Sequence, residues 1–409
     1  NIFLVLAFCH LEFLSSCKAV TNEVIESPVM RSQADAFLKN MPVGLQDRQT
    51  AAILKAIDGD NSELEAVRNS RNTAPKISEN VSVKMLSPIM RLYEPKDSVD
   101  DKLPILIYFH GGGWTFGSLN SCGRFCNAVA SYGRVKVLAV DYRLAPENPF
   151  PAGLEDCISS LQYVVDNADK LGIDYTKITL GGDSSGGNLA IATAISEGSL
   201  VESIVVFYPV TKAFNDGSAS WKEYGVGYGL DSSIMDAFNK AYAGEEDSRD
   251  LLVSVGLNDE RTLKTLPRTL LIAAGRDILC DQGVDFARKS SKRVKRIEFK
   301  DAVHLFITVP GQDEAFEKAV QYALDFIDNK YSSLLYHLIK YNNFRMNDIN
   351  FQRLETVIVD LRLEIPETIC LTTLLTGITQ NKLSPFAICV SVRPGRTSDI
   401  RMSVPLDFP

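Results

Sequence analysis

Short apolar runs alternate with helix-like stretches through the middle of the chain. The runs are residues 105–109, 137–140, 178–180, 204–207, 270–273 and, more weakly, 297–299. Continuous apolar strands that alternate with helices are typical of a parallel sheet covered on both faces. The pattern therefore predicts an α/β domain with a mostly parallel central sheet.

Two stretches break this alternation. Residues about 21–75 are polar with helical spacing of their apolar positions, which predicts helices. Residues about 211–265 lack strand–helix alternation and are expected to form an insertion over the sheet. Candidate substrate-pocket residues are Trp114, Trp221, Tyr224 and Tyr228, although buried packing is the role that we favour for the three in the insertion.

The first 20 residues have the composition expected of a leader sequence. An apolar run at 2–9 is followed by Leu-Ser-Ser-Cys at 14–17, which resembles the end of an export signal and fits a lipobox. His10 and Glu12 interrupt the run and no basic segment precedes it, so a buried strand or helix is the alternative. We interpret residues 1–20 as a truncated export signal or lipoprotein leader. The expected location is periplasmic, secreted or lipid-anchored, with the cytoplasm as the alternative.

The C-terminal stretch, residues 331–409, has nearly balanced charges, little glycine or alanine and no sustained periodicity. A small appended domain, a partner-binding tail and translated sequence outside the folded unit are all compatible with it. The composition favours the last two. The sequence thus predicts a leader at 1–20, one globular domain at 21–330 and a tail at 331–409 without an assigned function.

Composition narrows the function. The 409 residues are 45% apolar and 23% charged, as in globular proteins. A net charge of −8 argues against a nucleic-acid binder, which would carry a basic surface. No segment after the leader has the roughly 18 apolar residues of a membrane span. The cysteines match no metal-site spacing. We expect neither a metal nor an organic cofactor.

The strongest motif is Gly182-Asp183-Ser184-Ser185-Gly186, directly after one apolar run and before a helical stretch. Gly-x-Ser-x-Gly between a strand and a helix is the setting of a nucleophilic serine, because small neighbours permit a sharp, strained turn. The Ser185 N–H would then face developing negative charge at a helix N-terminus. A helix-capping turn is the alternative for the motif alone.

A second glycine motif, His110-Gly111-Gly112-Gly113, follows the run at 105–109. Consecutive glycines let backbone N–H groups converge on one oxyanion, as in the glycine loops of lipases and esterases. A phosphate-binding loop is the alternative, but the Gly-Lys-Ser/Thr and Gly-x-Gly-x-x-Gly patterns are absent. The motif therefore favours an oxyanion hole.

A serine nucleophile needs a base, usually an imidazole. Of four histidines, His10 lies in the leader, His110 in the glycine loop and His337 in the tail. His304, just after the last predicted strand, is left as the candidate base.

The acid that orients such a base falls between serine and histidine in α/β hydrolases. Asp277 directly follows the strand at 270–273, where a carboxylate would sit beside the nucleophile. Asp281 and Asp285 lie one and two turns into the next helix and are the less favoured alternatives.

Three motifs together resemble the hormone-sensitive-lipase branch of the α/β-hydrolase superfamily, the bacterial carboxylesterase and acetyl-esterase group. Besides 110–114 and 182–188, these include Asp-Tyr-Arg-Leu-Ala-Pro-Glu at 141–147, a structural signature of the branch. The resemblance covers about residues 25–328. The chain departs from the pattern in having Ser185 for alanine, Ile278 for proline and Leu305 for glycine.

The resemblance implies an α/β-hydrolase fold with helices on both faces of the sheet and a helical cap formed by 21–75 and 211–265. It also implies hydrolysis of small-molecule esters with short acyl groups, acetyl above all. Alternatives with the same chemistry are an exported carbohydrate deacetylase of the acetyl-xylan type and an amidase or formamidase. An inert ligand-binding relative is the non-enzymatic alternative. The implied site residues are Ser184 as nucleophile, His304 as base, Asp277 as its orienter, and Gly112, Gly113 and Ser185 as oxyanion-hole donors.

Overall fold

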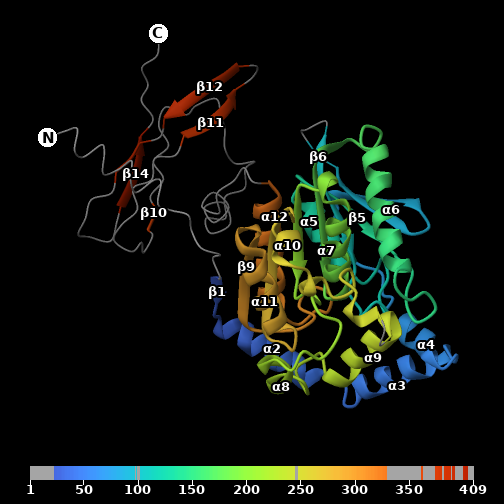
Figure 1. The fold of residues 1–409 in the computed structure, drawn as a ribbon. Coiled ribbons are helices and arrows are strands. Elements are labelled where there is room, and N and C mark those ends of the chain that lie inside the picture. Colours follow the sequence, from blue (N-terminus) through green and yellow to red (C-terminus); the bar gives the residue numbers. More distant parts are fainter. Residues whose placement is uncertain are drawn as a thin grey trace, which may run out of the picture. The chain divides into compact units, whose positions relative to one another are not determined.

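The computed structural model describes residues 23–96, 98, 102–244 and 247–328, together with the backbone of short strands between 361 and 403. The chain divides into two compact units, Asn1–Tyr331 and Ser332–Pro409 (Figure 1). The predicted leader, residues 1–20, lies outside the described residues. Strands of the second unit are β10 (Leu361–Arg362), β11 (Leu374–Thr379), β12 (Lys382–Ala387), β13 (Cys389–Ser391) and β14 (Asp399–Ser403). β11 pairs with β12, and β14 pairs with β10 and β13, all antiparallel.

A nine-stranded sheet forms the centre of the first unit, in the order β1-β9-β8-β7-β6-β4-β5-β3-β2. Pairing is parallel from β1 to β5, and β3 and β2 add an antiparallel edge. The strands are β1 (Glu23–Ile25), β2 (Val81–Ser87), β3 (Met90–Pro95), β4 (Leu103–Phe109), β5 (Lys136–Val140), β6 (Ile173–Asp183), β7 (Ser203–Phe207), β8 (Arg268–Arg276) and β9 (Val294–Val303).

All six apolar runs predicted as strands lie in strands β4 to β9, so the mostly parallel sheet is confirmed. The start of the predicted cap, from residue 21, is wrong in one respect. Glu23–Ile25 is not helical but pairs with Ile297–Phe299 as the edge strand β1. Three residues are too few to show an alternating pattern, and this pairing is made with a strand far along the chain.

Helices cover both faces of the sheet because successive strand side chains point to opposite sides. In β4, Ile105 and Ile107 belong to the core on one face, whereas Leu106 and Tyr108 belong to the core on the other. The first core includes α6 (Ala152–Asp166), α7 (Ser185–Glu197) and α11 (Cys280–Ser290). The second includes α5 (Gly123–Ser131) and α12 (Asp313–Asp328).

The remaining helices come from the two stretches that broke the sequence pattern. They are α2 (Pro28–Asn40), α3 (Leu45–Ile57) and α4 (Ser62–Ser70) from the first, and α8 (Ala219–Glu223), α9 (Ser232–Ala243) and α10 (Glu260–Leu263) from the second. Short 3-10 turns are η1 (Gly198–Leu200), η2 (Asp247–Arg249), η3 (Val255–Leu257) and η4 (Ser291–Arg293).

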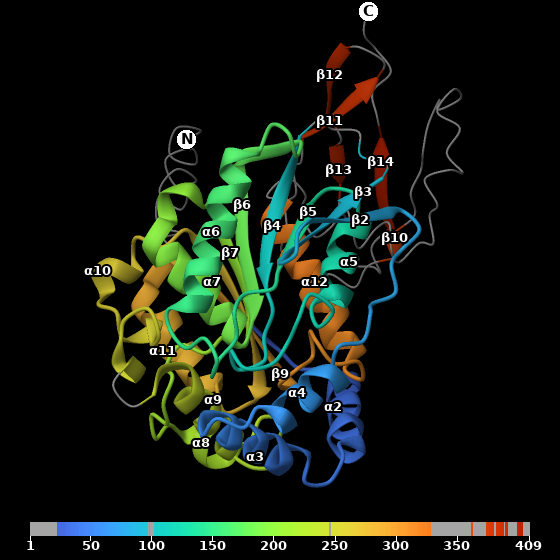
Figure 2. The same cartoon turned by 90° about the vertical axis from the view of Figure 1, so that its right-hand side faces the viewer.

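Segments far apart in the sequence meet at one end of the sheet. Helix α3 packs on α9, and Figures 1 and 2 show α2, α3, α4, α8 and α9 gathered beyond the end toward which β9 points. Helix α10 instead packs against α11. The helical layer over the carboxyl end of the strands is thus made by α2–α4 and α8–α9.

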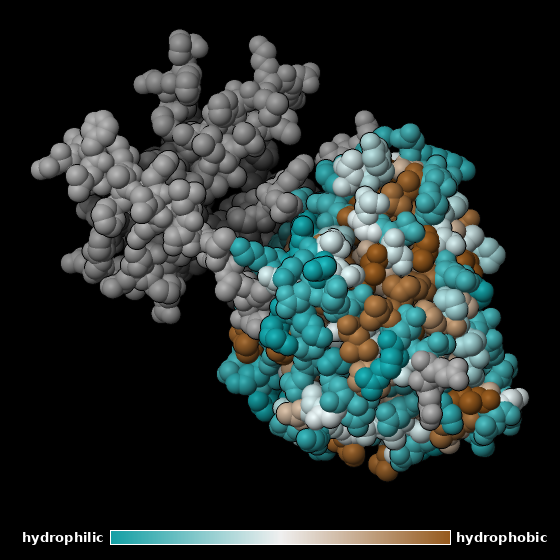
Figure 3. Space-filling view, viewed as in Figure 1, coloured by the Kyte–Doolittle hydropathy of each residue, from teal (hydrophilic) through white to brown (hydrophobic). Residues whose placement is uncertain are grey.

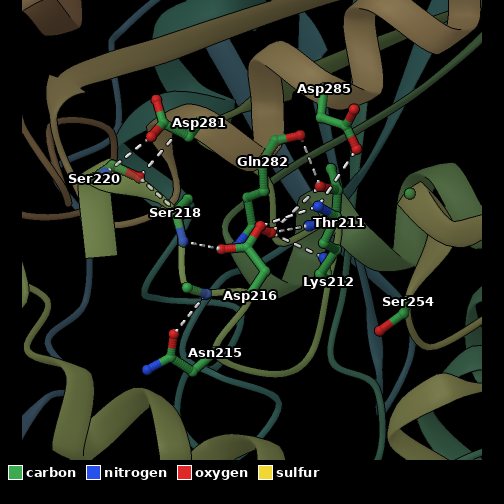
Figure 4. A network of polar contacts seen from close by, with 12 residues as sticks. Thr211, Lys212, Asn215, Asp216, Ser218, Ser220, Ser254, Asp281, Gln282 and Asp285 are labelled. Atoms are coloured by element: carbon green, nitrogen blue, oxygen red, sulfur yellow. Dashed lines mark hydrogen bonds and ion pairs between the residues drawn. The ribbon is translucent and has the colours of Figure 1, made fainter. Parts of the chain in front are cut away.

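A polar network ties the insertion to α11 (Figure 4). The Lys212 N–H donates to Gln282 Oε1 at 2.9 Å, and Lys212 Nζ lies 3.4 Å from Asp285 Oδ2. The Ser220 N–H donates to Asp281 Oδ2 at 2.9 Å. Asp281 and Asp285, the less favoured candidates for the catalytic acid, therefore hold the segment that leaves β7.

The surface of the first unit is largely hydrophilic on the face seen in Figure 3, with apolar side chains gathered toward its middle. Within the described residues, no helix is both long enough and apolar enough to cross a membrane.

Candidate active site

Ser184 lies on a tight turn between β6 and α7. Its φ of 53° and ψ of −119° are a strained conformation for a residue with a side chain. The turn fits only because its neighbours are glycines. A Cβ at Gly182 would lie 2.4 Å from Gly186 backbone atoms, and a Cβ at Gly186 would lie 2.0 Å from the Phe109 carbonyl oxygen. The predicted strand–turn–helix setting of the serine is thus what the structure has.

Three residues from separate strand ends meet at this turn. Ser184 Oγ lies 3.1 Å from His304 Nε2, and His304 Nδ1 lies 2.5 Å from Asp277 Oδ2. Asp277 also accepts the Leu279 N–H at 3.0 Å, which fixes the carboxylate. All three side chains are buried. The structure therefore brings together the predicted Ser184, His304 and Asp277 in an order that suits proton transfer from a hydroxyl to an orientated imidazole.

The loop that carries His304 is held by two buried side chains. The Tyr208 ring lies against the imidazole, with centroids 4.3 Å apart, and its hydroxyl accepts the Ile307 N–H at 3.1 Å. Gln312 donates to the His304 carbonyl at 3.0 Å and accepts the Val303 N–H at 3.0 Å. Neither Tyr208 nor Gln312 belongs to a sequence motif, and sequence reasoning missed both.

The glycine loop after β4 has the backbone that only glycine readily adopts. Gly112 and Gly113 have φ of 127° and 62°. A Cβ at Gly112 would lie 2.5 Å from the Phe116 carbonyl oxygen, and one at Gly113 would lie 2.1 Å from the Phe238 ring. Among the described residues, the N–H groups of Gly112, Gly113 and Ser185 donate to no protein acceptor. These predicted donors are free to bind an oxyanion.

A buried carboxylate joins the glycine loop to the serine turn. Asp183 Oδ1 accepts the Gly111 N–H at 3.0 Å and the Tyr108 hydroxyl at 2.9 Å. Burial raises the pKa of Asp183, and these two hydrogen bonds oppose the shift. Asp183 was visible in the serine motif, but its part in holding the two motifs together was not predicted.

His110 serves the loop through its ring and its backbone. Its Nδ1–H donates to the Gly111 carbonyl at 3.0 Å, and its ring stacks on Tyr142 with centroids 4.4 Å apart. Nε2 lies 3.5 Å from Asp141 Oδ1. Burial alone would lower the pKa of His110, but the interaction with Asp141 outweighs it and the pKa is raised. His304 is the histidine that contacts Ser184.

The predicted pocket aromatics divide into two pairs. Trp114 and Trp221 are buried, and the Trp114 ring stacks on Tyr242 at 4.4 Å, which agrees with the packing alternative. Tyr224 and Tyr228 are half-buried and in edge-to-face contact at 4.9 Å. Because Tyr224 and Tyr228 are only half-buried and lie in the insertion, they remain the candidates for contact with a substrate.

No group of three or more histidine, cysteine, aspartate or glutamate side chains within the described ranges is arranged to hold a metal ion.

Comparison with known proteins agrees with this architecture. A family described by the alpha/beta hydrolase fold matches residues 106–308. Carboxylesterase NlhH of Mycobacterium tuberculosis is 33% identical over 239 residues, which cover 55% of this chain and 74% of that protein. An ethyl acetate hydrolase of Pseudomonas putida is 37% identical over 212 residues, covering 49% of this chain and 64% of that protein.

Among solved structures, carboxyl esterase 2 of the fungus Tuber melanosporum superposes with a TM-score of 0.62. The match has 24% identity and covers 75% of this chain and 99% of that one, and it supports the fold. The chain belongs to the α/β-hydrolase family. The predicted kinship with the hormone-sensitive-lipase-like branch and the prediction of a carboxylesterase-type hydrolase are both confirmed.

Proposed function

We propose that this protein hydrolyses short-chain carboxylic esters through Ser184 as nucleophile, His304 as base and Asp277 as the acid that orients it. The observation that carries the proposal is the hydrogen-bonded line from Ser184 Oγ through both nitrogens of His304 to Asp277. Such a line removes the hydroxyl proton as the oxygen attacks, and so overcomes the weak nucleophilicity of serine.

The reaction has two halves. In the first, Ser184 Oγ attacks the ester carbonyl while His304 Nε2 takes its proton, and the tetrahedral oxyanion accepts N–H bonds from Gly112, Gly113 and Ser185. Collapse of this intermediate expels the alcohol, which takes the proton from His304. In the second half, water attacks the acyl-enzyme with His304 again as base, and the carboxylic acid leaves.

Preformed N–H donors supply much of the rate in such a site, because one lost donor typically costs about 10²–10³ in turnover. The N–H groups of Gly112 and Gly113 are oriented by the positive φ angles of these residues. The N–H group of Ser185 is oriented by the first turn of α7. Because these conformations are fixed by the fold, we expect little reorganisation of the backbone as charge develops on the substrate oxygen.

Two phenylalanines support a short acyl group. The Phe238 ring abuts Gly113, and Phe116 lies against Gly112. The two rings are in edge-to-face contact at 5.3 Å. This apolar wall limits the room beside the oxyanion donors. The Pseudomonas putida relative, named as an ethyl acetate hydrolase, agrees with a preference for small esters.

The test is Ser184→Ala assayed on p-nitrophenyl acetate, with Ser185→Ala as the matched control. We expect turnover to fall by at least about 10⁴-fold in the first, because the nucleophile is lost. The control should stay within a few-fold, because Ser185 acts through its backbone N–H. A fluorophosphonate should label the wild type and the control but not Ser184→Ala. Wild-type turnover in a folded Ser184→Ala protein would overturn the proposal.

A substrate profile refines the same proposal. Acetyl and butyryl esters should be hydrolysed faster than octanoyl esters. Faster release of acetate from acetylated xylan than from p-nitrophenyl acetate would instead favour the carbohydrate deacetylase.

A further inference from the structure

The C-terminal end of α4 is docked on the candidate oxyanion loop. Arg68 Nε donates to the Thr115 carbonyl at 2.8 Å, and the Ser118 hydroxyl donates to Asn72 Oδ1 at 2.9 Å. Arg71 lies between these two anchors. Contacts on both sides of it therefore fix its backbone beside a loop that begins far along the sequence.

The Arg71 guanidinium is one aromatic ring away from the oxyanion donors. It lies over the face of Phe116, with 5.3 Å from Cζ to the ring centroid. The Phe116 Cβ in turn would lie 3.1 Å from a Cβ on Gly112. Phe116 also contacts Phe238, which abuts Gly113. One aromatic ring therefore separates the guanidinium from the two glycines.

Arg71 has no anionic partner in the part of the chain that the structure describes. Its neighbour Arg68 pairs with Glu147 at 2.6 Å, and Arg143 pairs with Asp156 at 2.9 Å. The Arg71 side chain is half-buried, and burial lowers its pKa. A cation removed from water without a counter-charge is unfavourable, and the ring face offsets this only in part. The position therefore suits an anion that arrives with a ligand.

Given the ester hydrolysis proposed above, on which this inference rests, we propose that Arg71 binds a carboxylate on the substrate, so that the enzyme prefers anionic esters. Monoesters of dicarboxylic acids and esters of hydroxy acids have this chemistry. The guanidinium presents a planar pair of N–H donors that matches a carboxylate. The chain between the carboxylate and the ester carbonyl would have to match the separation that the Phe116 ring sets.

The test compares charged and neutral esters of matched length at pH 7.5. Monoethyl adipate and ethyl hexanoate differ on the acyl side of the ester, and 3-(butyryloxy)propanoate and propyl butyrate differ on the alcohol side. In Arg71→Met, kcat/KM should fall by about 10- to 100-fold for the charged member of one pair, as expected for loss of a charge-assisted hydrogen bond. Neutral esters should change by less than about two-fold. The affected pair identifies which side of the ester bears the carboxylate.

Two variants control this measurement. Arg71→Lys keeps the charge but not the planar donors, and should retain part of the preference. Arg249→Met removes an exposed guanidinium stacked on Phe214 at 3.6 Å, and should leave the charged-to-neutral ratio unchanged. Equal loss for charged and neutral esters in Arg71→Met, or no change in either ratio, would overturn the proposal and make Arg71 a packing residue.

The wild-type enzyme provides a readout that does not depend on a variant folding. The ratio of kcat/KM for a charged ester to kcat/KM for its neutral counterpart should exceed one at low salt. This ratio should decline at higher salt, because salt screens the attraction between Arg71 and the carboxylate. A ratio below one for both pairs at low salt would also overturn the inference. If no ester of either kind is hydrolysed and no fluorophosphonate labels Ser184, the proposed function itself fails instead.

Discussion

The two halves of the candidate site are held in place by different means. The serine turn and the oxyanion loop are positioned by backbone packed on backbone, with Gly186 against the Phe109 carbonyl and Gly112 against the Phe116 carbonyl. The half that carries Asp277 and His304 is positioned by side chains. The first half has no room for one additional carbon, whereas the second consists of separate contacts that can be removed singly.

This difference predicts two kinds of response to mutation. Where backbones touch, a single Cβ must move a strand or a helix, so the effect falls on folding. Where side chains hold a loop, loss of one contact lets the base drift, so the effect falls on turnover while the fold survives.

The largest effect is expected for Gly186→Ala. The added Cβ would lie 2.0 Å from the Phe109 carbonyl oxygen and 2.5 Å from that of His110, both of which are backbone atoms. We expect a loss of more than about 3 kcal/mol in the free energy of unfolding, or no soluble protein. Chemical denaturation followed by circular dichroism measures it.

Gly283→Ala is the matched control. Gly283 lies in α11, and its added Cβ would meet only Leu271 methyl groups at 3.7 and 4.0 Å. Alanine should stabilise this helix by about 0.5–1 kcal/mol. Similar stability of the two variants would contradict the backbone-packed description of the serine turn.

The same division explains what the sequence could predict. The serine turn and the oxyanion loop appear as contiguous sequence motifs, because a turn without room for side chains constrains the residue types at neighbouring positions. Asp277 and His304 were found because histidine is scarce and because both follow predicted strands. Tyr208 and Gln312 act through contacts with residues on other segments, and no local pattern marks them.

The sequence predicted which stretches form the helical layer over the site, but not how their helices pack. The two sequence stretches were recognisable because they lack strand–helix alternation. The contact of α3 with α9, and the placement of Phe238 against Gly113, depend on packing between segments far apart in the chain. Strand β1 was missed because its three residues gain their structure from pairing with β9.

The intermediate effect is expected at Tyr208, which tests the half held by side chains. Tyr208→Leu removes the ring against His304 and the acceptor of the Ile307 N–H. We expect kcat/KM for p-nitrophenyl acetate to fall by about 10- to 100-fold in a folded protein, because the base loses its support. Steady-state kinetics alongside the thermal midpoint separate this outcome from unfolding.

Tyr208→Phe isolates the hydroxyl. It keeps the ring but leaves the buried Ile307 N–H without its acceptor, at a cost of about 1–3 kcal/mol in stability. Tyr242→Phe is the control, because the buried Tyr242 hydroxyl has no hydrogen-bond partner among the described residues. That variant should be neutral or slightly stabilised. Unchanged kinetics in Tyr208→Leu would show that His304 does not need this support.

The smallest expected effect concerns Asp183, a buried side chain that joins the two backbone-packed motifs. Burial raises the pKa of this carboxyl above its ordinary 3.8. A raised pKa means that the folded state holds the proton more tightly than the unfolded state. The resulting stabilisation is complete below the unfolded pKa and is lost as pH rises through the folded pKa.

Asp183→Asn tests this linkage. Asparagine keeps an oxygen that can accept the Gly111 N–H and the Tyr108 hydroxyl, but it cannot ionise. The thermal midpoint of the variant relative to wild type should therefore improve as pH rises from about 4 through the folded pKa, and then level off. A difference that is the same at every pH would mean that the buried carboxyl does not change its protonation over this range. Such a result would contradict the raised pKa of Asp183, and the constant difference would then measure only the cost of replacing the carboxyl group with an amide.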